Sequence, residues 1–177
     1  MLRNVFLAGM IIVTGALSIS LPSFAQSSVA KEVIWFRSVQ TSLSKSAAKC
    51  GLNDPNILAT HLSQQLQAIG ITRNPKSRIV ATLSIAAQSF GILSTQCVYN
   101  LTFQLQSFLN AQEITTPDPR LRAALSRLGH LPVSIYQDGI FGVVVLSGSL
   151  DGSESMRTKV KEDISTIVGR LRVARAR

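Results

Sequence analysis

The most constraining pattern in this chain is a strict alternation of apolar and polar side chains over residues 99–106, which Cys97 extends on the apolar face. Side chains that alternate in this way point to opposite faces of a β-strand. One face must be buried and the other must meet water, which is typical of an antiparallel sheet covered on one side. The apolar members are Cys97, Tyr99, Leu101, Phe103 and Leu105, and the polar members are Asn100, Thr102, Gln104 and Gln106.

Two earlier segments also predict strands. Val33–Leu43 alternates in its second half, and Ile79–Gln88 carries apolar residues at every second position. Few residues separate Ile79–Gln88 from the strand that starts at Cys97. We therefore expect these two strands to pair as an antiparallel hairpin.

Two β-rich segments late in the chain, Pro132–Tyr136 and Ile140–Leu146, flank the sequence Gln137-Asp138-Gly139. An Asp-Gly pair between apolar runs is a strong signal for a hairpin turn. The alternative is a single strand with an irregular approach, because Gly142 weakens the second run. The sequence favours the hairpin and leaves the single strand open.

Three segments predict helices, because their apolar residues recur every three or four positions. Asp54 and Asp118 each precede a proline, which is the combination of N-cap and first helical residue that favours a helix start. Asp151 and Glu154 can form a capping box for the last helix. The predicted helices cover residues 55–69, 121–128 and 151 to about 172.

The predicted order is therefore β-α-β-β-(α)-β-β-α. This order indicates an α+β two-layer sandwich, in which one mainly antiparallel sheet of four to five strands carries two to three helices on one face. A ferredoxin-like arrangement is the leading special case, because β-α-β-β-α-β without the last helix is its element order.

The first 25 residues carry the pattern of a secretory signal peptide. Arg3 supplies a positive start, an apolar run covers Val5–Leu21, and small residues at Ser23 and Ala25 form a cleavage site. The alternative, an anchor that is never removed, is disfavoured because the run is short for a spanning helix. We expect cleavage after Ala25, which leaves residues 26–177 as one periplasmic or secreted domain that does not span the membrane.

Beyond this leader the chain has two cysteines, Cys50 and Cys97. In an oxidising compartment an even pair predicts one disulfide bond. The bond would close a loop of 46 intervening residues. The alternative is a pair of buried thiols.

Basic residues outnumber acidic ones by 18 to 9, for a net charge of +9, which falls to +8 when Arg3 leaves with the leader. Such an excess favours anionic partners, and export makes nucleic acid an unsuitable one. The acid-free C-terminal tail, about residues 170–177, could contact an anionic envelope surface. Its cations are Arg170, Arg172, Arg175 and Arg177.

The inventory of catalytic groups is sparse. His61 and His130 are isolated in the sequence, so with two disulfide-bonded cysteines we expect no metal site and no cofactor. Most carboxylates stand at helix starts or turns, and Glu113 alone does not make the pair that a glycosidase needs. These residues predict a non-enzymatic protein. The alternative is a small exported hydrolase whose site assembles only in the fold.

Four features together give a resemblance to known proteins. They are Cys50-Gly51-Leu52 before a capped helix, a strand opening with Cys97-Val98-Tyr99, the late Tyr136-Gln137-Asp138-Gly139, and a final amphipathic helix. The chain resembles small exported bacterial α/β proteins of unknown function. Its element order is similar to that of periplasmic envelope modules such as the N-terminal domain of the translocation protein TolB. The resemblance implies a periplasmic, non-enzymatic module, so we expect a binding or envelope-assembly protein whose partner is an envelope protein or an anionic surface.

Overall fold

A computed structural model of the chain describes residues 33–90, 96–114, 116–146 and 152–176. The predicted leader, its cleavage site after Ala25 and the predicted cap at Asp151 lie outside these residues. Export and processing therefore stay predictions of the sequence. None of the helices in the described part of the chain is both long and apolar enough to cross a membrane.

The centre of the fold is a four-stranded mixed sheet in the order β2-β4-β5-β6. Its first pair, β2 and β4, is parallel, and the other two pairs are antiparallel. A separate two-stranded parallel sheet joins β1 to β3. The strands are β1 (Trp35–Phe36), β2 (Ser38–Leu43), β3 (Thr72–Arg73), β4 (Ile79–Phe90), β5 (Gln96–Asn110) and β6 (His130–Val145).

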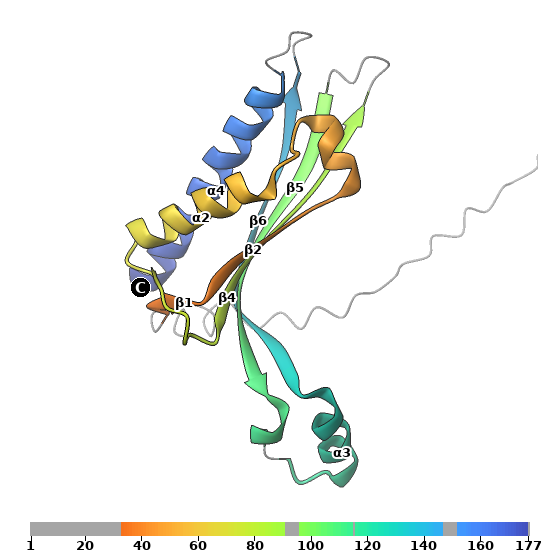
Figure 1. Cartoon of the computed structure of the whole chain (residues 1–177), viewed down its shortest axis with the longest axis vertical. Coiled ribbons are helices and arrows are strands. Elements are labelled where there is room, and N and C mark those ends of the chain that lie inside the picture. Colours follow the sequence, from red (N-terminus) through yellow and green to blue (C-terminus); the bar gives the residue numbers. More distant parts are fainter. Residues whose placement is uncertain (1–32, 91–95, 115, 147–151, 177) are drawn as a thin grey trace, which may run out of the picture.

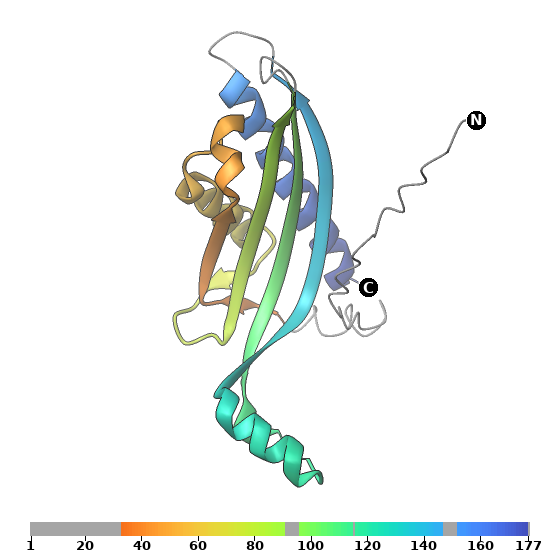
Figure 2. The same ribbon diagram turned by 90° about the vertical axis from the view of Figure 1, so that its right-hand side faces the viewer.

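Two long helices, α2 (Pro55–Ala68) and α4 (Gly152–Ala176), cover one face of this sheet (Figures 1 and 2). The short helix α3 (Pro119–Leu128) lies away from them, at the end of an arm formed by β5 and β6. Two 3₁₀ helices, η1 (Lys45–Cys50) and η2 (Ala111–Glu113), complete the described elements. The predicted two-layer α+β sandwich is confirmed.

The core lies between the sheet and the two long helices. The alternation that predicted β5 holds in the structure, because the five residues predicted to point inward, at every second position from Cys97 to Leu105, are all buried. Leu58, Leu62 and Leu66 face them from α2, at the spacing of a helical stripe. The matching stripe of α4 consists of Met156, Val160, Ile164, Ile167, Val168 and Leu171.

The ferredoxin-like arrangement is wrong for this chain. In that motif a strand separates the two parallel strands of the βαβ unit. Here β2 and β4, which flank α2 in the sequence, are direct neighbours, with Ser38 opposite Val80 and Leu43 opposite Ile85. The antiparallel strands β5 and β6 then extend the sheet on the far side of β4.

The predicted hairpin at residues 137–139 is also wrong, and the single-strand alternative is confirmed. β6 runs without a turn through this segment, with Asp138 opposite Phe103 and Gly139 opposite Thr102. The long partner β5 offers pairing over its whole length, and this outweighs the local turn preference of Asp-Gly. The irregular approach is a β-bulge, because Tyr136 pairs with Leu105 and Ser134 with Gln106, which leaves Ile135 as the extra residue.

The strand predicted over Val33–Leu43 is interrupted. The backbone bends at Arg37, between β1 and β2, and the Arg37 N–H donates to the carbonyl of Ile79 at 2.6 Å. The bend separates the residues that pair with β3 from those that pair with β4. It also places Arg37 at the start of the sheet edge.

Gly142 has a packing role that the sequence does not reveal. It lies opposite Tyr99 in the β5–β6 register, and a Cβ added there would stand 2.4 Å from the Tyr99 ring. The ring needs this space because its hydroxyl donates a hydrogen bond to Asp163 of α4. A glycine in β6 thus lets a tyrosine of β5 reach the covering helix.

Replacing Gly142 with alanine should therefore lower the free energy of unfolding by roughly 1–3 kcal/mol, the usual range for overpacking a core. The matched control is Gly169→Ala in α4, where nothing stands within 4 Å of the added Cβ. That change should leave the stability unaltered or raise it by roughly 0.5–1 kcal/mol, because alanine favours a helix interior. Urea unfolding of both variants measures the difference. Equal stabilities of the two variants would contradict the packing role.

The predicted disulfide between Cys50 and Cys97 is confirmed, with both cysteines buried. It joins η1 to the start of β5, next to the start of α4. Gly51 adopts a positive φ of 81° directly after Cys50, and it lies so close to Ser153 that an added Cβ would stand 2.4 Å from the Ser153 Cβ and 2.5 Å from its Cα. One end of the sheet, η1 and α4 are therefore held together at this bond.

Replacing both cysteines with alanine should lower the free energy of unfolding by roughly 3–4 kcal/mol, because the unfolded chain regains the freedom of the long closed loop. Chemical denaturation of the variant and the oxidised wild type measures the loss, and intact mass with and without reductant verifies the bond. An unchanged free energy of unfolding would show that the bond does not constrain the unfolded chain.

Candidate anion-binding groove

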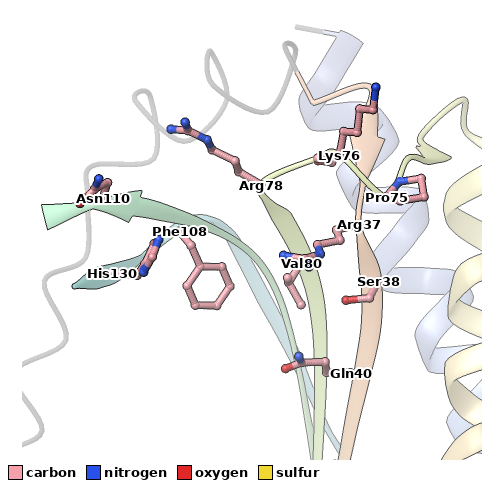
Figure 3. A pocket seen from close by; sticks show the side chains of 11 residues that line it. Arg37, Ser38, Gln40, Pro75, Lys76, Arg78, Val80, Phe108, Asn110 and His130 are labelled. Atoms are coloured by element: carbon pink, nitrogen blue, oxygen red, sulfur yellow. The ribbon is translucent and has the colours of Figure 1, made fainter. Parts of the chain in front are cut away.

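The uncovered face of the sheet carries an open groove of about 710 Å³ at the end where the arm begins. In Figure 3, Phe108, Asn110 and His130 lie on one side of it, and Arg37 and Ser38 lie on the other. The floor includes Val80 of β4, which is opposite Ser38 of β2 and Gln106 of β5. The groove thus collects residues from all four strands of the sheet and from the loop between β3 and β4.

The charges around this groove are of one sign. Arg37, Lys76 and Arg78 contribute side chains to its lining, and no aspartate or glutamate of the described chain does. Carboxylates pair with Lys159 and Arg170 elsewhere, on α4 and beside β6. A concave site with cations and no carboxylate attracts anions, and low-dielectric walls concentrate the field inside it.

A tight turn before β4 holds Lys76 at the rim of the groove. The Asn74 side chain accepts a hydrogen bond from the Lys76 N–H at 3.0 Å, and the Asn74 carbonyl accepts one from the Ser77 N–H at 2.9 Å. The Ser77 hydroxyl then donates to the carbonyl of Trp35 at 3.2 Å, which fastens the turn to β1. Asn and Pro in this turn are the residues expected at such a position.

Three residues of the groove, Phe108, Asn110 and His130, come from the base of the arm. The Phe108 N–H donates to the carbonyl of Arg78 at 3.3 Å, which fastens β5 beside the turn. Asn110 pairs with His130 across the arm. Because His130 is exposed and begins β6, its imidazole adds a hydrogen-bonding group to the basic rim.

Sequence reasoning did not identify this site. A basic turn at residues 73–76 is visible in the sequence, but Arg37 lies inside a predicted strand and His130 is distant from both. The signal that could have found the site is the pairing of β2 with β4, since this pairing brings Arg37 next to the turn. That pairing is non-local, and the alternation pattern alone does not determine it.

The four arginines of the predicted basic tail belong to or follow α4. Arg170 pairs with Asp138 of β6 at 3.3 Å, and Arg175 donates to the carbonyl of Ile69 at 2.8 Å. Arg172 is exposed, and Arg177 lies outside the described residues. Two of the four thus contact the domain itself, and their contact with an anionic surface stays a prediction.

The two histidines lie on different elements, with different neighbours. His61 of α2 places its Nε2 atom 3.1 Å from the carbonyl oxygen of Lys161 and 3.3 Å from the hydroxyl of Ser165. His130 lies at the groove. Within the described ranges, no hydrogen bond joins either imidazole to a carboxylate, and no group of three or more metal-ligating side chains is present. The hydrolase alternative gains no support from these contacts.

A buried polar cluster ties β5 to α4 on the opposite side of the sheet. Asp163, which is only 4% exposed, accepts hydrogen bonds from the Tyr99 hydroxyl and from Lys159 Nζ, the latter at 2.7 Å. Burial, reinforced by the hydrogen bond and the charge of Asp163, raises the pKa of Tyr99 well above its ordinary value. The hydrogen bond to Asp163 also raises the pKa of Lys159. Because the Asp163 carboxylate already accepts hydrogen bonds from two side chains, this cluster supports the fold.

Raising the pH above about 10, where an exposed tyrosine ionises, should destabilise the protein. The pKa of Tyr99 is higher in the folded state than in the unfolded one, so its contribution is complete below that pH and is lost as the pH rises. Tyr99→Phe should make the free energy of unfolding fall less steeply between about pH 9 and 11. Urea unfolding across this range measures the slope. An identical slope in both proteins would contradict the role of Tyr99.

Comparisons with known proteins do not assign this chain to a family. No model of a known protein family matches it, and no curated protein matches it in sequence. Among solved structures, a PelC dodecamer from Paraburkholderia phytofirmans is similar to it at 12% identity and a TM-score of 0.36, over 78% of this chain and 89% of that one. A minor lipoprotein from Acinetobacter baumannii matches at 12% identity and a TM-score of 0.33, over 77% and 88%. Likenesses of this size do not bear on function.

Proposed function

We propose that this chain is an exported, non-enzymatic protein of the cell envelope that binds an anionic envelope component. The observation that carries the proposal is the groove, where cations from the β1–β2 bend and the β3–β4 turn meet with no carboxylate among the described residues of the lining. Phosphate and carboxylate groups are the chemistry that such a groove recognises.

Two independent features support export. The leader pattern over residues 1–25 predicts secretion, and a buried disulfide is typical of proteins from oxidising compartments. The high positive charge agrees with an anionic partner in the envelope, such as phospholipid head groups, lipopolysaccharide or an acidic polysaccharide.

The C-terminal arginines provide a second contact in this proposal. Arg172 is exposed on α4, so its guanidinium is available to an extended anionic surface. Arg170 and Arg175 contribute charge to the same end of α4 while they hold β6 and α2. The groove supplies the specific contact, and the tail adds long-range attraction.

The double variant Arg37→Gln/Lys76→Gln tests the groove directly. Association with lipopolysaccharide, with phosphatidylglycerol vesicles and with polygalacturonate is measured by co-sedimentation or surface retention. The variant should bind its preferred probe roughly ten- to thirty-fold more weakly, since each cation near an anionic surface contributes about 1 kcal/mol. Comparing the three probes distinguishes lipid-borne phosphate from polysaccharide carboxylate.

The matched control is Lys45→Gln/Lys49→Gln, which removes the same charge at exposed positions outside both the groove and the C-terminal tail. It should change the affinity less than about twofold. Equal losses of affinity in the two variants would show that binding is non-specific attraction to the net charge, and a larger loss in the control would place the binding site outside the groove. Absence of binding to all three probes by the wild type would contradict the proposal itself.

A further inference from the structure

The long edge strand β6 carries the least protected surface of the described fold. Among the described strands, none pairs with its outer edge, so half of its backbone N–H and C=O groups face away from the sheet. Such an edge is a template for another strand, and proteins usually guard it with charges, prolines or bulges. On β6 the proline is Pro132, the bulge is at Ile135 and the charge is Asp138. All three lie in residues 130–138, which we call the first half of the strand; residues 139–145 are the second half.

The second half of β6 has none of them. Residues 139–145 contain no proline and no charged side chain. Three side chains of this half point to the uncovered face and are largely exposed: Phe141 at 70%, Val143 at 52% and Val145 at 65%. Phe90 on β4 is also exposed at the same end of the sheet, where it pairs with Gln96.

The other edge of the same sheet differs in both respects. β2 has only six residues, and its outward side chains are Ser38, Gln40 and Ser42. A short polar edge gives an incoming strand few contacts. The two edges of this sheet therefore differ, because exposed apolar side chains lie on the second half of β6 and polar side chains lie on β2.

We propose that two copies of this chain associate through the second half of β6, as antiparallel strands about a two-fold axis at Val143. The two four-stranded sheets then form one continuous sheet. This proposal is independent of the groove, which lies at the opposite end of the sheet.

The sequence of this segment matches itself in that register. The axis pairs Val143 with its own copy and Phe141 with Val145 of the second copy, so that all three exposed side chains meet apolar partners. On the covered face, Ile140 meets the second copy's Leu146 and Gly142 meets Val144. Two-fold interfaces require this self-complementarity, since each patch must fit an identical patch. Main-chain hydrogen bonds supply affinity, and the apolar pairs define the register.

The mass of the full chain in solution, measured by light scattering across the micromolar range, tests the association. The wild type should be a dimer that dissociates on dilution, and Val143→Lys should be a monomer, because two ammonium groups would then face each other at the axis. The matched control is Val133→Lys, which changes a residue of the same strand that is 38% exposed and lies in the guarded half. It should remain a dimer.

A cysteine at the axis tests the register without disturbing the fold. Val143→Cys should form a disulfide between two copies on mild oxidation, since side chains directly opposite each other are close enough to bond, whereas Val133→Cys should not. A monomeric wild type at all concentrations would overturn the proposal. A Val143→Lys protein that stays dimeric would also overturn it, because the interface would then lie elsewhere. Circular dichroism of each variant establishes that it is folded.

Discussion

The structure depends on the burial of one complete face of β5. Five consecutive inward residues of this strand are buried, and the strand pairs with β4 from Gln96 to Ser107 and with β6 over its whole length. Two of the five residues also tie β5 to other elements: Cys97 bonds to Cys50 of η1, and Tyr99 donates to Asp163 of α4. A register slip of one residue would expose the whole core face and break both ties, so β5 determines where every neighbour must lie.

This arrangement gives the sheet one face covered by helices and one uncovered face, and both proposed contacts lie on the uncovered face. The covered face is apolar, and the one buried carboxylate among the described residues, Asp163, lies there. It accepts a hydrogen bond from Tyr99, which holds α4 against the sheet, and a second one from Lys159 of the same helix. The uncovered face is left to water and to partners. Its two ends differ, since one end is basic and concave at the base of the arm and the other is apolar at the end of β6. Binding and association can therefore occupy one face without competing.

The sequence alone predicts the layers and most of the elements, because alternation in β5 and the helical stripes of α2 and α4 are local signals. It also predicts the disulfide from two cysteines and a leader. It fails where non-local pairing prevails over local preference: Asp138-Gly139 continues a strand because β5 supplies a partner, and β2 joins β4 directly. The groove follows from that same parallel pairing, so neither Arg37 nor His130 stands out before the strands are placed. The positive charge indicates an anionic partner, but only the fold locates the cations around a cavity.

The most direct test of the account is to locate a bound anion. Crystals of the protein soaked with tungstate or selenate would show the anion by its anomalous scattering. The account predicts the strongest peak in the groove, next to the Arg37 guanidinium. A groove without a peak, with anions gathered only along the C-terminal arginines of α4, would contradict it.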